Sequence, residues 1–258
     1  MTYFSQNDHM ALLSSEMNRQ GGENGLQRVF MRMQDLHRDL QPRLRKLNID
    51  LFTNAKMMED VTTDTSACNT HSEVMTLSYM RSRTQAKVIE GIMGRDALNN
   101  SDTIEAQRHP VIELRMSPDG FAIEFLIAPD AWYDQQNVVG KLTVQEHRLA
   151  LYNLLNNLSG DYRVGFWNGA HLDDMHLSTE QLPPAHVMSQ WLDTFAAGRD
   201  WFRVGIWYEP EAIELASENI VETVLTHIRE LYALYEFVSW NSNNNYHNFY
   251  KRAVAQTR

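Results

Sequence analysis

The chain has 258 residues, and its content of 43% hydrophobic and 22% charged residues is that of a globular protein, which excludes global disorder. Its formal net charge of −10 argues against nucleic acid as a partner, because phosphate groups are bound by clustered Lys and Arg. A single cysteine, Cys68, together with the lack of a long apolar run or a signal-peptide pattern, predicts a cytoplasmic protein that does not enter a membrane.

The first predicted element is a long amphipathic helix over residues 26–47. Its apolar side chains recur mostly at spacings of three and four, which places them on one stripe. They are Leu26, Val29, Phe30, Met33, Leu36, Leu40, Leu44 and Leu47. Pro42 is expected to kink or divide this helix, because proline removes a backbone donor and clashes with the preceding turn. Residues 1–58 therefore form a helical lead-in, and the polar segment 59–73 is predicted to be a loop.

A strand at 74–80 and a short helix at 85–94 are expected to precede a β-hairpin at 111–129. Two alternating runs of apolar and polar residues flank the tetrapeptide Ser-Pro-Asp-Gly in this hairpin. Pro118 presets a turn dihedral, and Gly120 tolerates positive φ, so the tetrapeptide is typical of a tight turn.

The length of the hairpin loop decides whether two glutamates face each other. A two-residue loop places Glu113 opposite Glu124, whereas a three-residue loop with a bulge breaks this pairing. Facing carboxylates destabilise a sheet unless they share a cation or a proton, and such pairs occur in acid–base sites. Both registers fit the sequence. The segment 129–137 is predicted to be a loop in which Trp132, Asp134, Gln136 and Asn137 could border a pocket or a partner surface.

Helices and strands alternate in the second half of the chain. Thr143 and Glu146 form a capping-box pattern at the start of a helix that Gly160 is expected to end. Further helices are expected between Ser178 and Gly198 and over 218–240. The strands RVGFW and RVGIWY lie between these helices.

This order of elements predicts a single α/β domain over residues 1–258. We expect one mixed sheet that contains a β-hairpin and a βαβ unit and is flanked by helices, after the N-terminal helical lead-in. The tail, 241–258, is expected to be loosely ordered.

Three features follow one another in a characteristic order along the chain. They are the amphipathic segment GLQRVFMRMQDLHRDLQPRLRKL, the hairpin segment IELRMSPDGFAIEFLIAP, and a long C-terminal helix after a strand. In this order the chain resembles the uncharacterised bacterial YktB-like families. The resemblance implies an amphipathic N-terminal helix that ends near Pro-x-Leu, followed by a sheet with flanking helices. It implies no particular activity.

The fragments RVGFWNG and RVGIWYE nearly copy each other and offer a candidate ligand site. Alternation places Arg163 and Trp167 on one face of the first strand, and it places Arg203 and Trp207 on one face of the second. The helix between the strands predicts a crossover that makes them parallel, with all four side chains on one face of the sheet.

Two interpretations of this face are open. Guanidinium groups bind carboxylate or phosphate and indoles stack on rings, so the face could bind a small anionic or aromatic ligand. Alternatively, the glycine in each fragment lets a tryptophan or a helix approach the backbone, and the arginines lie over the indoles as cation–π partners.

The loop after the first fragment offers a candidate metal site, with two histidines and two aspartates within six residues. They are His171, Asp173, Asp174 and His176. Imidazole nitrogen and carboxylate oxygen are ligands of divalent metal ions. The spacing matches no known metal signature and also fits a solvated turn. Apart from such a divalent metal ion, no cofactor is expected.

The leading functional hypothesis is a binding module that recognises a small anionic or aromatic ligand, or a protein partner, through the arginine and tryptophan face. The first alternative is a hydrolase in which a metal ion on the histidine–aspartate loop activates water. The second is a structural or oligomerisation protein with the C-terminal tail as a docking arm.

Overall fold

The computed structural model describes residues 2–13, 22–53, 61–63, 73–92, 104, 106–168, 172 and 174–246. Within these residues, eight strands form one sheet in the order β1-β3-β4-β5-β8-β6-β7, with β2 also paired to β3. Every neighbouring pair in this sheet is antiparallel. The strands are β1 (Phe52–Thr53), β2 (Val61–Thr63), β3 (Glu73–Met80), β4 (Val111–Ser117), β5 (Gly120–Ile127), β6 (Arg163–Gly165), β7 (His176–Ser178) and β8 (Phe202–Tyr208).

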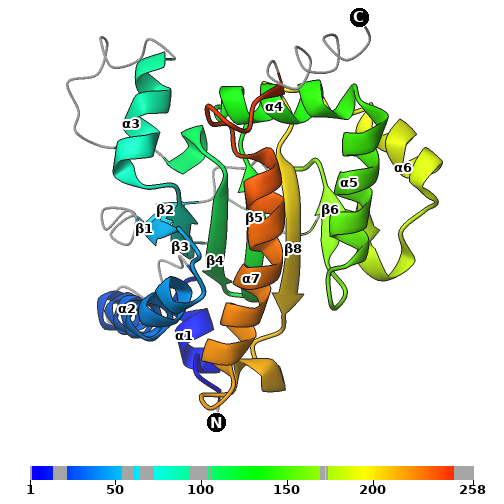
Figure 1. Cartoon of the computed structure of the whole chain (residues 1–258). Coiled ribbons are helices and arrows are strands. Elements are labelled where there is room, and N and C mark those ends of the chain that lie inside the picture. The colour runs from blue at the N-terminus through cyan, green and yellow to red at the C-terminus, as the bar shows by residue number, and fades with distance from the viewer. Residues whose placement is uncertain are drawn as a thin grey trace, which may run out of the picture.

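Helices surround this sheet (Figure 1), and α7 lies over β4 and β5 with α2 and α5 packed beside it. The helix α3 continues from the end of β3, away from the centre of the sheet. The helices are α1 (Gln6–Met10), α2 (Gly22–Lys46), α3 (Arg83–Ile92), α4 (Trp132–Leu142), α5 (Gln145–Asn156), α6 (Ala185–Leu192) and α7 (Ile220–Val238). The α/β class and a sheet flanked by helices are thus confirmed.

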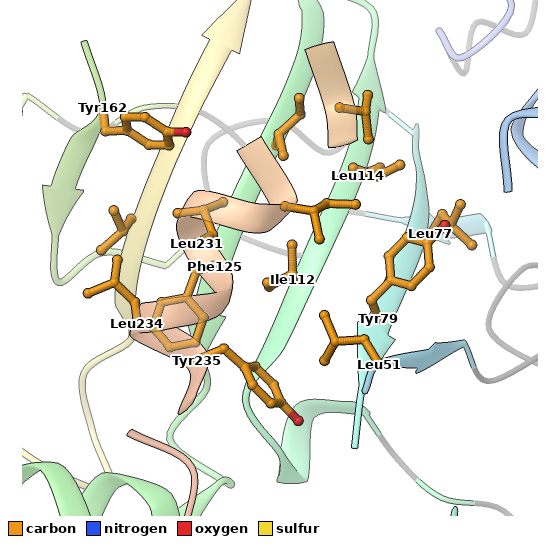
Figure 2. Packing of buried hydrophobic residues seen from close by; sticks show 14 of the residues in the cluster. Leu51, Leu77, Tyr79, Ile112, Leu114, Phe125, Tyr162, Leu231, Leu234 and Tyr235 are labelled. Atoms are coloured by element: carbon orange, nitrogen blue, oxygen red, sulfur yellow. The ribbon is translucent and has the colours of Figure 1, made fainter. Parts of the chain in front are cut away.

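The hydrophobic core lies between α7 and the apolar face of the sheet (Figure 2). Strand alternation produces this face, since Leu114 pairs with Ile123 across the hairpin and Ile112 pairs with Phe125. Leu231 of α7 packs in the same cluster and is fully buried. The opposite face of the central strands carries the charged residues Arg115, Glu124 and Arg203 beside a second, smaller apolar cluster that includes Val111 and Leu126, and the candidate site lies there.

The hairpin is confirmed, and its register settles the question of the two glutamates. Ser117 pairs with Gly120, so Pro118 and Asp119 form a two-residue turn and Glu113 lies opposite Glu124. A Cβ atom at position 120 would lie 2.2 Å from the carbonyl oxygen of Tyr208. Glycine is therefore required there to let the turn approach β8.

The prediction that the repeated fragments form parallel strands is wrong. The strands β6 and β8 are neighbours, but they run antiparallel, with Arg163 opposite Gly205. The reason is β7, a three-residue strand that begins at His176, the last residue of the predicted metal loop. This strand reverses the chain after β6, so the crossover through α6 joins β7 to β8, two strands that run in the same direction with β6 between them.

Three local predictions also need correction. Pro42 lies inside a continuous α2. Thr143 is the C-cap of α4, where its hydroxyl donates to the carbonyl of Gly140 at 2.7 Å, so it does not cap α5. The segment 129–137, predicted to be a loop, contains the start of α4 at Trp132. Polar side chains of this helix are buried because they form hydrogen bonds with backbone groups in the interior, as described below.

Candidate functional site

A buried carboxylate lies at the centre of the sheet face opposite α7. Glu124 of β5 is fully buried, and its two oxygens accept hydrogen bonds from Arg203 Nη2 at 2.7 and 2.8 Å. Arg115 of β4 forms a second ion pair with the same carboxylate. Both arginines are buried as well, with 2% and 7% of their surface exposed. Charged groups taken out of water are stable only when paired, so these three side chains act as one unit.

Two glycines make this arrangement sterically feasible. A Cβ atom on Gly205 would lie 2.6 Å from Cγ of Glu124, its cross-strand partner. A Cβ atom on Gly165 would lie 2.4 Å from the six-membered ring of Trp167. The glycine of each repeated Arg-Val-Gly therefore leaves a gap in the sheet surface. Glu124 fills the gap at Gly205, and Trp167 fills the gap at Gly165.

A layered stack leads from this carboxylate towards a pocket. The guanidinium carbon of Arg203 lies 5.0 Å from the ring centroid of Trp167, a cation–π distance. The ring of Trp167 is in turn 5.9 Å from that of Trp207, with an angle of 40° between the planes. Trp167 is buried with 5% of its surface exposed, whereas Trp207 is half-buried. The inner side of Trp207 is therefore supported by Trp167, which itself packs on Arg203.

Trp207 lines a pocket of about 190 Å³ beside the hairpin turn. Arg115 lines it from β4, Leu172 from the loop after β6, and two exposed acidic residues, Asp119 and Glu209, from the turn and from the end of β8. The lining is completed by Ser117, Gly120, Ala122 and Tyr208. The pocket therefore combines an aromatic wall, a guanidinium group and two carboxylates.

The structure brings the four predicted ligand-binding residues to one sheet face but gives them different surroundings. Of the four, Trp207 lines the pocket. Arg203 and Trp167 are enclosed in the stack, which is the packing arrangement of the second interpretation. Arg163 is half-buried and pairs with Asp161.

The predicted metal loop lies partly outside the described residues, which exclude His171 and Asp173. Asp174 is exposed, and His176 is half-buried in β7, opposite Gly165. Among the described residues, no group of three or more His, Cys, Asp or Glu side chains could hold a metal ion. Metal binding by this loop stays a prediction.

Comparison with protein-family models finds no match, and a search of curated proteins finds none either. In the part of the chain that the structure describes, no helix is both long and apolar enough to cross a membrane. The function must therefore be inferred from the side chains and their geometry.

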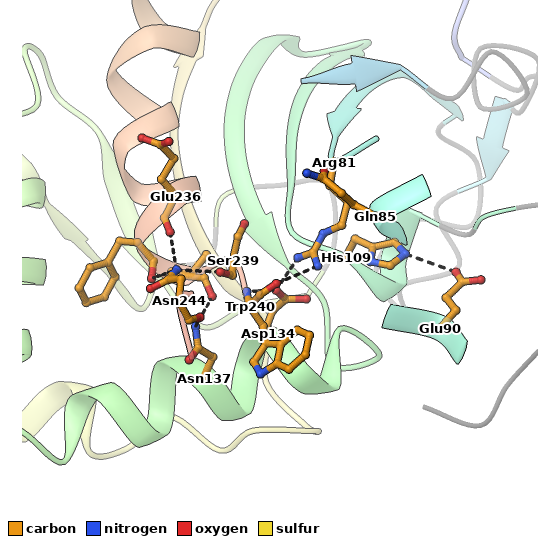
Figure 3. A network of polar contacts seen from close by, with 12 residues as sticks. Arg81, Gln85, Glu90, His109, Asp134, Asn137, Glu236, Ser239, Trp240 and Asn244 are labelled. Atoms are coloured by element: carbon orange, nitrogen blue, oxygen red, sulfur yellow. Dashed lines mark hydrogen bonds and ion pairs between the residues drawn. The ribbon is translucent and has the colours of Figure 1, made fainter. Parts of the chain in front are cut away.

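A second buried polar network was missed by the sequence analysis (Figure 3). Arg81, which follows β3, donates to Asp134 of α4, and Asp134 also accepts the backbone N–H of Trp240 at 2.7 Å. The amide of Asn137 donates to the carbonyls of residues 238 and 244, at 3.0 and 3.1 Å. Asp134, Asn137 and Lys141 recur at helical spacing and are all buried. Their polar stripe faces the backbone of 238–246 rather than water, and this anchors the start of the tail.

His109 lies beside this network and is fully buried. Its Nε2 is 3.3 Å from Glu90 Oε1. Burial, reinforced by the positive charges of Arg81 and Arg108, lowers the pKa of His109 from 6.5 to about 3. The imidazole is therefore neutral at physiological pH.

A third network joins β8 to the surface of α7. The Tyr208 hydroxyl lies 2.6 Å from His227 Nε2, His227 Nδ1 bonds Tyr162, and the Tyr162 hydroxyl donates to Glu230 at 2.7 Å. Burial lowers the pKa of His227 and raises that of Tyr208 to about 12. These hydrogen bonds join His227 and Glu230 of α7 to Tyr208 of β8 and to Tyr162, and so they hold α7 against the sheet.

Proposed function

We propose that this chain is a binding protein for a small molecule with a single ring, held in the pocket beside Trp207. The observation that carries the proposal is a half-buried indole that forms one wall of a pocket of about 190 Å³. An apolar cavity of about 150 Å³ accommodates a benzene ring, so the volume suits one ring with a small substituent. Indole faces stack favourably on flat rings.

The support behind Trp207 favours binding because it keeps the wall in place before a ligand arrives. Trp207 packs on Trp167, which lies over Arg203, and Arg203 is held by two hydrogen bonds to Glu124. A side chain that is already fixed loses little conformational entropy when it contacts a ligand. Ligand sites are commonly built in this way, with a second layer of residues that orients the first.

The test is calorimetric titration of the protein with benzamide and related single-ring compounds. We expect saturable one-to-one binding, and we expect Trp207→Ala to weaken it at least tenfold, because the stacking surface is removed. Trp132→Ala is the matched control, since Trp132 is 48% exposed on α4 and does not line the pocket. Absence of binding by every ring compound, or equal binding by Trp207→Ala that folds normally by circular dichroism, would refute the proposal.

A further inference from the structure

We propose that the ligand of this pocket is a small organic cation, a ring that carries an amidinium, guanidinium or ammonium group. This inference rests on the proposed function and adds the charge of the ligand. Two of the residues that line the pocket, Asp119 and Glu209, are exposed carboxylates on different segments of the chain. A cation bound against Trp207 would lie within the field of both.

The arginines near the site do not favour an anion, because carboxylates already engage them. Arg203 and Arg115 pair with Glu124, and Arg163 pairs with Asp161. Arg115 lines the pocket, but an anionic ligand would compete with the fully buried Glu124 for its guanidinium group. The same ligand would also lie beside Asp119 and Glu209, the two carboxylates that line the pocket. The anionic ligand predicted from the repeated arginines is therefore replaced by a cationic one.

Apart from Arg115, which is paired with Glu124, the charged side chains that line the pocket are acidic. Residues 116–130 and 204–227 contain no lysine or arginine. The second of these segments contains five glutamates, namely Glu209, Glu211, Glu214, Glu218 and Glu222, of which Glu222 is paired with Arg43. Together with the net charge of −10, these carboxylates are expected to favour the approach of a cation over that of an anion.

The indole of Trp207 adds a recognition element for positive charge that does not depend on the carboxylates. Tryptophan is the aromatic side chain that binds cations most strongly, through the negative potential of its ring face. Trp167, which lies behind Trp207, already makes such a cation–π contact: the guanidinium carbon of Arg203 is 5.0 Å from its ring centroid. We expect Trp207 to bind the cationic group, or the ring that carries it, from the pocket side.

The experiment compares benzamidine, benzamide and benzoate, three ligands of nearly the same shape that are positive, neutral and negative at pH 7.5. We expect benzamidine to bind at least tenfold more tightly than benzamide, and benzoate to bind more weakly than benzamide. The preference for benzamidine should shrink as the salt concentration rises, because exposed carboxylates are screened.

Glu209→Gln should weaken the binding of benzamidine several-fold and that of benzamide by a clearly smaller factor, whereas Glu211→Gln, an exposed neighbour that does not line the pocket, should change neither. If benzamide or benzoate binds as tightly as benzamidine, the ligand is not selected for positive charge, and this inference fails while the proposed function stands. If none of the three binds, both fail.

Discussion

Replacement of Glu124 by glutamine is expected to lower the free energy of unfolding by about 3–5 kcal/mol, the range found when one partner of a buried ion pair is removed. The glutamine keeps the shape of the side chain and an oxygen for Arg203, but it removes the charge. Arg203 and Arg115, both less than a tenth exposed, are then left without their counter-ion. Urea denaturation at neutral pH, followed by circular dichroism, measures this loss.

Glu113→Gln is the matched control, because Glu113 lies directly opposite Glu124 in the hairpin. It is half-buried rather than fully buried, and its carboxylate accepts a hydrogen bond from Ser78 Oγ at 3.1 Å. We expect a loss below about 1.5 kcal/mol there, because one ordinary hydrogen bond is weakened. Similar losses for the two variants would show that Glu124 has no special role and that the stack behind Trp207 is held by packing alone.

The second large effect is expected on acidification. Lowering the pH from 7.5 to 4.5 should reduce the free energy of unfolding by roughly 3 kcal/mol through His109, because the proton affinities of the folded and unfolded states differ over about two pH units of this range. The pKa of His109 is about 3 in the folded protein against 6.5 in the reference state. Between these values the unfolded chain binds a proton that the folded chain does not. Stability is therefore complete above pH 6.5 and is lost as the pH falls towards 3.

Urea denaturation of the wild type and of His109→Gln at both pH values isolates this contribution. The variant is expected to be less stable at pH 7.5, because the hydrogen bond between His109 and Glu90 is lost, but its stability should fall less on acidification. Burial also lowers the pKa of His9, His37 and His227, so some acid sensitivity will persist. His186→Gln, at an exposed position of α6, serves as control. An equal fall in the wild type and in His109→Gln would contradict the prediction.

Local patterns predicted the parts of the fold in which partners are close in sequence. The hairpin of β4 and β5 is such a case, since alternation and the Pro-Asp-Gly turn lie within one segment. The strand β7 has only three residues and no periodicity of its own, so nothing marked it among the polar residues of its loop. Missing this strand was sufficient to reverse the predicted direction of β8 relative to β6.

The candidate site was predictable in composition but not in contacts. Alternation correctly assigns Arg203 and Gly205 to one face of β8, and the sequence also suggested that a glycine admits a bulky neighbour. It could not show that the neighbour of Gly205 is Glu124, because this depends on the register between β5 and β8, which are far apart in the chain. The same limit explains why Asp134 was predicted to border a pocket or a partner surface rather than to be buried, since its backbone partner, Trp240, is 106 positions away.

The most direct test of the account is the indole N–H signal of Trp207 in a ¹H–¹⁵N spectrum during titration with benzamidine, with Trp207→Phe to assign the signal. This N–H is buried, at the wall of the proposed binding pocket. We predict that the Trp207 signal moves saturably, with a smaller change at Trp167 behind it and none at the exposed Trp132. If the Trp207 signal stays in place at saturating benzamidine, benzamide and benzoate, the pocket does not bind small ring compounds and the central claim is wrong.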